Sequence, residues 1–482
     1  MDSHYTPAYK PYAHQAAALR GLEGKEAFAL FMAMRTGKSK TILDDFGRLE
    51  LEGKVNNLFV ISPGGALHPW TLDADKHLSA DLRSRVVIHT WASGAGVGAQ
   101  RALEAFLKLR GVPRILLMNV EALSSVKRAR EVALAFASSA PTMLVVDEST
   151  TIKNSSSKRT KFINGQLAGH GAYRRILCGL PTPKSPLDLF GQMEFLDWRI
   201  IGSRSFFAFR NRYAVLEPLY LGGRVIQQVV GYKNMEELTE KLKPFSYRCT
   251  LADCYDLPER QYAFRDVELT PEQRRLYNEL RDYATVQLSS GEHVTATVVI
   301  AVIIRLHQVL CGHTRDEGGQ WHDVPEHRTA ALLEELSEYD GKAVIWCAYS
   351  RDVDKVTEAL AKEYGRVSIA RFWGGNAATR EAEEAVFKTD PLCRFMVATA
   401  AAGGRGRTWD MADLNIFHSN SDNLEHRLQA EERPQNVGKT RSVSYVDLVC
   451  RGTVEEKFIA SLRAKIDLAT AVMGDDPMTW LI

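Results

Sequence analysis

The sequence predicts an α/β fold in which two parallel-sheet lobes are separated by a largely helical insertion. Short β-rich apolar segments alternate with helical patterns up to residue 200 and again after residue 325. Such alternation is typical of a parallel sheet covered on both faces. The middle of the chain instead carries amphipathic helical segments, at Met235–Leu242, Pro271–Gln287 and Val298–Leu310. We therefore expect a first lobe over 1–200, an insertion and linker over 201–325, and a second lobe over 326–482.

Each lobe is predicted from a series of apolar segments, which are followed by polar or glycine-bearing turns. In the first lobe these strands are expected at Ala27–Met32, Leu58–Ile61, Val86–His89, Ile115–Met118, Met143–Val146 and Ile176–Leu177. In the second lobe they are expected at Ala343–Cys347, Val367–Arg371, Phe395–Ala398, Leu414–His418 and Ser444–Val449.

Length and composition agree with several globular domains. The chain has 482 residues, which at about 150 residues per domain suggests roughly three. Hydrophobic residues make up 45% and charged residues 25%, which excludes a disordered, collagenous or coiled-coil chain. There are 61 lysines and arginines against 59 acidic residues, so the net charge is +2. That balance neither requires nor excludes nucleic acid as a partner.

The seven cysteines are scattered and odd in number, which favours a reducing intracellular compartment. A loose cluster, Cys249, Cys254, Cys311 and His313, matches no common zinc spacing, so we expect no metal site there. The amino terminus lacks a secretory pattern. No apolar run approaches the roughly 20 residues of a membrane span. We expect a cytoplasmic protein without membrane association.

A phosphate-binding loop is the strongest single signal. The apolar segment Ala27–Met32 leads into Arg35–Ser39 and then into a predicted helix. Gly37 would let the backbone approach phosphate oxygens, while the first N–H groups of the helix and its dipole favour an anion. Lys38 would reach the β- and γ-phosphates, and the Ser39 hydroxyl would ligate Mg²⁺.

The loop departs from the usual pattern at two positions. The first glycine of the pattern would fall at Met32, and Arg35 also replaces a usual glycine. A chance Gly-Lys-Ser at a helix start is therefore the alternative, which the strand–loop–helix context opposes.

An acidic strand end is the second signal. The apolar segment Met143–Val146 runs into Asp147 and Glu148. In a parallel sheet this end opens on the same edge as the phosphate loop. Asp147 would hold Mg²⁺ through water, and Glu148 would orient and deprotonate an attacking water. The alternative is an acidic strand end that simply faces solvent.

These motifs and their order resemble those of Swi/Snf-type ATPases in helicase superfamily 2. In the first lobe the similar segments are Lys10-Pro11-Tyr12 with His14-Gln15, Ile61-Ser62-Pro63 with Trp70, Asn119–Leu123, Asp147–Ser149 with Ile152–Asn154, and Cys178–Pro183. In the second lobe they are Val344–Cys347 with Tyr349-Ser350, Ala398–Gly406, and Gln429–Arg433 with Gly438. Gly231–Leu238, Asp256–Pro258 and Glu268–Gln273 are similar to compact phage and bacterial members, which would place a phage-encoded chain in the host cytoplasm.

The resemblance implies two RecA-like lobes with ATP and Mg²⁺ between them. It implies ATP contacts from Gln15, Arg35, Thr36, Gly37, Lys38, Ser39, Gly406 and Gln429. It implies catalytic roles for Lys38, Asp147, Glu148 and Arg433, and Mg²⁺ ligation by Ser39 and Asp147. The family's second arginine of the last motif would fall at Asn436, which carries no charge. Arg405, Arg407 and Lys439 are the nearby cations that could compensate for it.

The resemblance also implies DNA contacts, from Lys153, Asn154, Lys158, Trp70 and Gly404. A motor that tolerates any sequence should contact backbone phosphates. For the lysines the alternative is a solvated face, for Trp70 it is core packing, and for Gly404 it is a plain tight turn.

The function that follows is an ATP-dependent DNA translocase or helicase on duplex or branched DNA, in replication, recombination or repair. The alternative is an ATP-binding DNA scaffold or regulator with weak hydrolysis, because Asn436 replaces an arginine. Another type of phosphate-loop NTPase would leave the second lobe unexplained. A monomer is the expectation for the oligomeric state, which the sequence does not determine.

Overall fold

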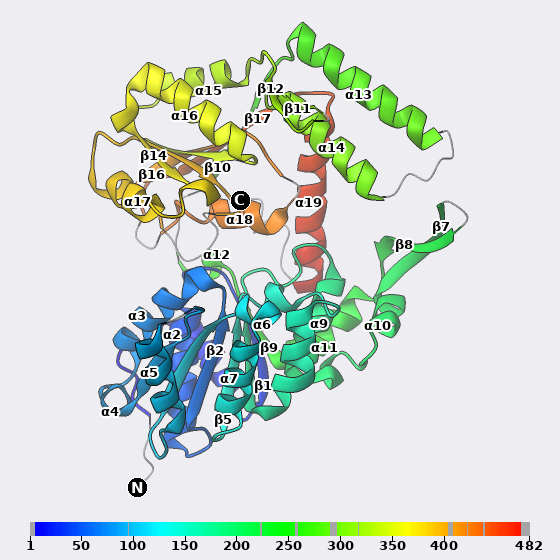
Figure 1. The fold of residues 1–482 in the computed structure, drawn as a ribbon. Helices are drawn as coiled ribbons and strands as arrows, with labels where there is room; N and C mark the ends of the chain where they lie inside the picture. Colours follow the sequence, from blue (N-terminus) through cyan, green and yellow to red (C-terminus); the bar gives the residue numbers. More distant parts are fainter. Residues whose placement is uncertain are drawn as a thin grey trace. The chain divides into compact units, whose positions relative to one another are not determined.

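The computed structural model describes residues 5–94, 96–221, 224–255, 259–289, 296–316, 318–402, 408–421, 423–436 and 439–473. The chain divides into two compact units, each of which contains one large sheet (Figure 1). The first unit is built from residues up to Val215 together with 231–255 and 468–473. The second unit is built from 216–230 and from 259–467.

The first unit contains a seven-stranded parallel sheet in the order β3-β4-β2-β5-β6-β1-β9. Its strands are β1 (Ala27–Met32), β2 (Asn57–Ser62), β3 (Val87–Thr90), β4 (Arg114–Asn119), β5 (Thr142–Asp147), β6 (Gly171–Leu177) and β9 (Ser246–Cys249). Its helices are α1 (Ala13–Leu22), α2 (Lys38–Leu51), α3 (Leu67–His77), α4 (Ala80–Arg85), α5 (Val97–Lys108), α6 (Ala122–Ser125), α7 (Lys127–Ala137), α8 (Lys158–Phe162), α9 (Leu189–Asp197), α10 (Phe206–Tyr213), α11 (Met235–Leu242) and α12 (Leu251–Cys254).

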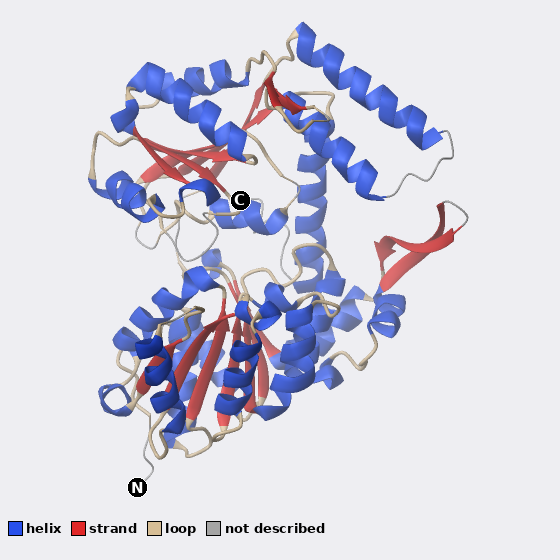
Figure 2. Cartoon of the chain, viewed as in Figure 1, coloured by secondary structure: helices blue, strands red, loops and turns tan. Residues whose placement is uncertain are grey.

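Both faces of this sheet are buried. Phe59 and Ile61 of β2 belong to one apolar core, whereas their neighbours Leu58 and Val60 belong to the other. Alternate side chains of a strand point to opposite faces, so a continuous apolar segment fits a sheet covered by helices on both sides. Figure 2 shows this layered arrangement of strands and helices.

The second unit contains a six-stranded parallel sheet in the order β10-β17-β16-β13-β15-β14. Its strands are β10 (Arg260–Asp266), β13 (Lys342–Cys347), β14 (Ile369–Phe372), β15 (Phe395–Thr399), β16 (Ala412–Phe417) and β17 (Val443–Val449). Its helices are α13 (Pro271–Ser289), α14 (Ala296–Leu310), α15 (Arg328–Ser337), α16 (Ser350–Tyr364), α17 (Arg380–Thr389), α18 (Leu424–Glu431) and α19 (Val454–Met473), and β11 (His313–Arg315) pairs with β12 (Trp321–Asp323).

The segment between the predicted lobes contains the expected helices α11, α13 and α14, and it also contains strands that the sequence did not predict. β9 adds an edge strand to the first sheet, and β10 adds one to the second. β7 (Ala214–Leu221) and β8 (Arg224–Tyr232) form a two-stranded sheet. β9 has only four residues, and β10 exposes most of its side chains. Neither strand therefore has the apolar pattern by which strands are recognised. The division of the chain into two lobes and an insertion remains a prediction.

Candidate nucleotide site and DNA-facing residues

The phosphate loop lies between β1 and α2 and contains two left-handed residues, Arg35 with φ 65° and Gly37 with φ 82°. Glycine adopts this conformation without steric cost. A Cβ atom on Gly37 would also lie 2.1 Å from Nε2 of Gln15, so the position requires glycine for two reasons. Arg35 holds the same conformation at a cost of about 1–3 kcal/mol. This is the physical consequence of an arginine at a position where the pattern has glycine.

The lysine of the loop is held by carbonyl groups of the loop itself. Nζ of Lys38 donates to the carbonyl oxygens of Met32, at 2.9 Å, and Ala33, at 3.1 Å. The buried Thr36 hydroxyl donates to the Ala33 carbonyl at 2.7 Å. These bonds fix the ammonium group at the amino end of α2, where helix N–H groups favour an anion. The geometry therefore fits the phosphate-binding role that the sequence predicts.

Gln15, a predicted ATP contact, is hydrogen-bonded to the same loop. Its Nε2 donates to the Thr36 carbonyl at 3.1 Å, and His14 Nε2 lies 2.8 Å from that oxygen. The Tyr12 N–H donates to Oε1 of Gln15 at 3.1 Å. Tyr12 is 60% exposed and stacks on His14 with ring centroids 5.9 Å apart. The amino-terminal motif thus places an exposed aromatic face beside the loop, while an ATP contact by Gln15 remains a prediction.

Asp147 is held at the carboxyl end of β5 by three donors. Its Oδ2 accepts from the Ser62 hydroxyl and from the Trp70 indole N–H, each at 2.9 Å, and its Oδ1 accepts from the Glu148 N–H at 2.9 Å. Ser62 ends the neighbouring strand β2, in which Ile61 is paired with Val146. Glu148 is left-handed, with φ 48°. Strained backbone of this kind is concentrated at functional sites.

A second carboxylate, that of Asp73 on α3, joins the loop to the acidic strand end. Its carboxyl group interacts with the Ser39 side chain and with the charge of Asp147. Burial raises the pKa of Asp73, and the interaction with Ser39 only partly opposes that rise. Ser39, Asp73 and Asp147 together offer hydroxyl and carboxylate oxygens, the donors that Mg²⁺ prefers. The residues present therefore fit a magnesium ion, while its ligation by Ser39 and Asp147 remains a prediction.

Trp70 requires a correction. It was predicted as a DNA contact, with core packing as the alternative, and the structure places it only 2% exposed with its N–H on Asp147. A side chain with so little free surface offers no face to DNA. The hydrophobic core of the first unit packs around its ring. We therefore assign Trp70 the role of supporting the carboxylate of Asp147.

Replacing Trp70 by phenylalanine tests this assignment. The substitution keeps most of the buried ring and removes one hydrogen bond to a charged acceptor, worth about 1.5–3 kcal/mol. We expect ATP turnover to fall about tenfold and to require more Mg²⁺, with unchanged affinity for duplex DNA. Trp198→Phe, in the same unit, is the matched control. Weaker DNA binding with normal Mg²⁺ dependence would restore the DNA role instead.

Gln192 connects the acidic motif to the segment that follows β6. It is fully buried on α9, where Oε1 accepts from the Ser149 hydroxyl at 2.6 Å. Its Nε2 donates to the carbonyls of Pro181, at 2.7 Å, and Asp188, at 2.9 Å. One amide group therefore links the two motifs through hydrogen bonds. No motif in the sequence indicated this residue.

The predicted DNA contacts after the acidic motif lie on the surface. Lys153 is half-buried, and Asn154 and Lys158 are exposed. Oδ1 of Asn154 accepts from the Ser156 N–H at 2.9 Å and from its hydroxyl at 2.7 Å. Asn154 thus shapes its own turn, and contacts of these three residues with DNA remain predictions. Gly404, Gly406, Arg405, Arg407 and Gly438 lie outside the described residues.

The predicted ATP-contacting residues of the last motif are buried within the second unit. Arg433 is 1% exposed, with its guanidinium 5.4 Å from the centre of the Trp409 ring. Asn436 donates to Asp410 at 2.5 Å. Lys439 forms an ion pair with Asp413 at 2.8 Å and donates to two carbonyl groups, so its charge is paired within the second unit. Its compensation for a second arginine remains a prediction. Gln429 is buried and lies 3.4 Å from Glu425. The catalytic role of Arg433 and the ATP contact of Gln429 remain predictions.

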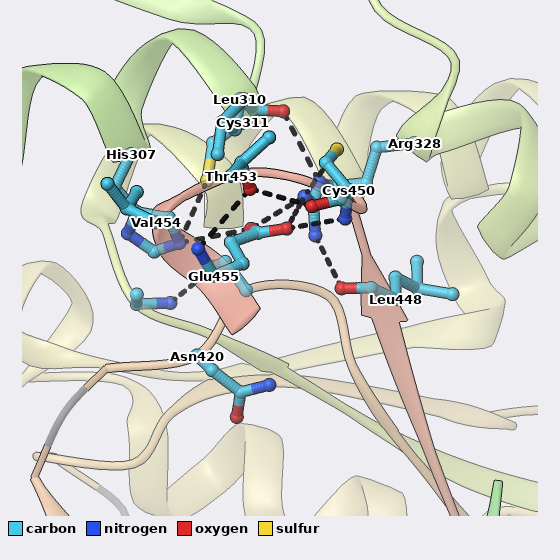
Figure 3. A network of polar contacts seen from close by, with 12 residues as sticks. His307, Leu310, Cys311, Arg328, Asn420, Leu448, Cys450, Thr453, Val454 and Glu455 are labelled. Carbon is cyan, nitrogen blue, oxygen red and sulfur yellow. Dashed lines mark hydrogen bonds and ion pairs between the residues drawn. The ribbon is translucent and has the colours of Figure 1, made fainter. Parts of the chain in front are cut away.

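The cysteine and histidine cluster noted in the sequence is not one group. Cys249 and Cys254 belong to the first unit, and Cys311 and His313 to the second. Within the described residues, one group of three possible metal ligands has its atoms within 4.8 Å: His307, Cys311 and Glu455. Figure 3 shows that Glu455 there faces Arg328, with contacts of 2.6 and 2.7 Å to its two oxygens. A buried guanidinium beside the carboxylate disfavours a second cation, so this group is an ion-pair network.

A parallel sheet that carries a phosphate loop and an acidic strand end on one edge is the architecture of nucleotide-binding α/β proteins. The chain belongs to the SNF2 family: residues 28–315, more than half of the chain, match the model of the SNF2-related domain. The resemblance to Swi/Snf-like superfamily 2 proteins and the α/β fold with two RecA-like lobes are thereby confirmed. Membership of this family supports ATP binding and hydrolysis.

Individual relatives are distant. TATA-binding protein-associated factor MOT1 of Saccharomyces cerevisiae is 24% identical over 380 residues, which cover 68% of this chain and 20% of that protein. An uncharacterized ATP-dependent helicase of Mycoplasma pneumoniae is 21% identical over 465 residues, which cover 95% of this chain and 41% of that protein. This chain thus spans about a fifth of the length of the first relative.

Among solved structures, the chain is similar to the Sulfolobus solfataricus SWI2/SNF2 ATPase core in complex with dsDNA. The identity is 22%, the TM-score is 0.42, and the match covers 98% of this chain and 95% of that one. The core domain of the same protein matches with a TM-score of 0.40. Among the residues that the structure describes, no helix has the length and apolar character that crossing a membrane requires.

Proposed function

We propose that this chain is an ATP-dependent DNA translocase or helicase that acts on duplex or branched DNA. The observation that carries the proposal is the meeting of Lys38, Ser39 and Asp147 at one edge of the first sheet, in a chain of the SNF2 family. The setting would be DNA replication, recombination or repair in the cytoplasm, with the chain acting as a monomer.

In the proposed reaction the first unit binds ATP and activates water. Lys38 and the amino end of α2 would hold the phosphates, and Ser39 and Asp147 would hold Mg²⁺, with Asp73 beside them. A bound Mg²⁺ ion would neutralise charge on the phosphate oxygens. Glu148 would orient the attacking water and take its proton. Phosphoryl transfer needs mainly positioning and charge stabilisation, which is what the hydrogen bonds to Asp147 supply.

DNA would be bound through its backbone. Asn154 and Lys158 are exposed on the segment that follows the acidic strand end, and Lys153 is next to them. Contacts of lysine with phosphate are independent of sequence and weaken as salt concentration rises. The bridge from Ser149 through Gln192 to Pro181 supports a coupling between this DNA-facing segment and the nucleotide site.

The second candidate is a DNA scaffold that binds ATP and hydrolyses it weakly. The surroundings of Asn436 favour it, because the neutral Asn436 amide is bonded to Asp410 and the charge of Lys439 is taken by Asp413. A well-placed arginine contributes roughly 10³–10⁵ in rate to phosphoryl transfer, so its absence would leave a slow enzyme.

Phosphate release with saturating single-stranded, duplex, forked and four-way DNA separates the two candidates. A motor should be stimulated by at least one of these DNAs, most strongly by duplex or branched forms. Turnover that stays at the DNA-free level with all four would favour the scaffold. A parallel binding assay in which all four DNAs bind with equal affinity would show that the lack of stimulation is not caused by a failure to bind DNA.

A further inference from the structure

Glu148 and Lys153 lie at the two ends of one short hydrogen-bonded turn. The turn is the 3₁₀ segment Ser149–Ile152, and Glu148 precedes it with a left-handed backbone, at φ 48°. The Thr151 N–H donates to the Glu148 carbonyl at 2.9 Å, and the Lys153 N–H donates to the Thr150 carbonyl at 3.3 Å. The place of Glu148 therefore depends on what holds this turn.

Helix α9 contacts the turn at both ends through two adjacent residues. At the first end the fully buried Ser149 hydroxyl donates to Oε1 of Gln192 at 2.6 Å. At the other end Gly191 packs directly against the backbone. A Cβ atom on Gly191 would lie 2.3 Å from the Ile152 carbonyl oxygen and 3.0 Å from that of Lys153. No side chain fits there, so the helix and the turn are in backbone contact.

The orientation of the Gln192 amide is fixed by its two other bonds. Nε2 donates to the carbonyls of Pro181, at 2.7 Å, and Asp188, at 2.9 Å. A carbonyl oxygen can only accept, so the nitrogen must face these two groups and Oε1 is left for Ser149. The Asp188 carboxylate also accepts from the Lys184 N–H, at 2.8 Å, at the start of α9. Gln192 therefore presents its oxygen to Ser149 from a fixed frame.

We propose that Gln192 is a positioning residue, which through its bond to Ser149 holds the Glu148 carboxylate where it can take a proton from water. The role rests on the proposed function, in which Glu148 is the general base. A misplacement of about 1 Å can cost about 10²-fold in rate, so a bond one residue from the base is enough to matter. Gln192 itself touches neither nucleotide nor water in this role.

Gln192→Met removes the three hydrogen bonds and keeps most of the buried volume, because the two side chains have nearly the same length. The variant misplaces the base and leaves the phosphate loop intact. We therefore expect kcat for ATP, with saturating duplex DNA, to fall about tenfold while KM for ATP stays within about twofold. Steady-state phosphate release measures both.

Ser149→Ala is the second variant, because it leaves α9 as it is. It removes only the bond to Oε1 of Gln192 and keeps the bonds of that amide to Pro181 and Asp188. Its loss of kcat should match that of Gln192→Met. In a Glu148→Gln background, Gln192→Met should cause no further loss in single-turnover phosphate release, because no base is left to position.

Asn164→Leu is the matched control. The Asn164 amide also binds α9, since Nδ2 donates to the Gly191 carbonyl and to the Glu194 carboxylate, each at 2.9 Å. It forms no bond with Ser149, so turnover should stay within about twofold of wild type. An equal loss of kcat in Asn164→Leu would show that any loosening of α9 slows the reaction, and the inference would then be wrong.

Hydrogen exchange of the whole chain, followed by mass spectrometry of the peptide that spans 148–153, tests the positioning without ATP. Exchange there should be about tenfold faster in Gln192→Met and unchanged in Asn164→Leu. Unchanged exchange or unchanged kcat in Gln192→Met would overturn the inference, and so would a further loss in the Glu148→Gln background. If the wild-type chain hydrolyses no ATP, the proposed function fails, while the exchange rates still decide whether Gln192 holds the turn.

Discussion

Replacing Glu148 by glutamine should stop ATP turnover while nucleotide still binds. Glutamine has nearly the same shape, so it fits the left-handed position of Glu148, but its amide cannot take a proton from water. General-base catalysis of this kind contributes about 10²–10⁴ in rate, and we expect a loss of that size. Lys38→Ala should differ, because it removes the ammonium group itself and should weaken nucleotide binding. Steady-state phosphate release and a nucleotide-binding assay measure the two effects.

The matched control for Glu148→Gln is Glu131→Gln on α7. Glu131 is exposed and forms ion pairs with Lys127 and Arg128 on its own helix. The substitution removes the same charge from the same unit, so turnover should stay at the wild-type level. Turnover of Glu148→Gln within a few-fold of wild type would show that another group activates the water, and the assigned site would then be wrong.

Replacing Arg328 by methionine should strongly destabilise the second unit. The guanidinium is fully buried, contacts both oxygens of Glu455 and donates to the carbonyls of His418, at 2.5 Å, and Leu448, at 2.9 Å (Figure 3). Its removal leaves a buried carboxylate without its cation, which costs about 3–5 kcal/mol. Urea unfolding of the variant and of wild type measures this loss. In the control, Arg351→Met, an exposed pair with Asp323 is lost, and the expected cost is below about 1 kcal/mol.

The pH dependence of stability should reverse in the Arg328 variant. Burial alone raises the pKa of Glu455, but the charge of Arg328, together with His307 and the Cys450 N–H, lowers it to about 2. A carboxyl with a lowered folded pKa stabilises the protein above its unfolded pKa, and that stabilisation is lost as the pH falls toward 2. Without Arg328 the buried carboxylate should prefer its proton, so mild acid should improve stability. Glu455→Gln added to Arg328→Met should recover part of the loss, and no recovery would contradict this account.

The sequence predicted the two sheets well because their strands are buried on both faces. β1 and β5, for example, are continuous apolar segments that end at a functional loop. The edge strands β9 and β10 were not predicted, because strand pairing rather than an apolar pattern defines them. The predicted helices in the middle of the chain are present because their apolar residues recur at helical spacing.

The candidate site was predicted where a residue acts through its position in a motif, as Lys38 and Asp147 do. It was missed where the role comes from a contact between distant elements. Asp73 and Gln192 lie on different helices, and they join the site through contacts with residues that are distant in the sequence. Asp73 lies one helical turn after Trp70, so both side chains are on the same face of α3. The sequence would have indicated Asp73 only if the bond from Trp70 to Asp147 had been known. Trp70 was assigned to DNA because a motif cannot show which way a side chain is buried.

Displacement of a third strand from a DNA triplex tests the central claim most directly, because a protein that moves along duplex DNA removes the third strand without separating the duplex. The account predicts displacement that requires hydrolysable ATP and is absent in Glu148→Gln. DNA-stimulated ATP turnover without faster displacement would contradict translocation, and the chain would then use ATP for something other than movement.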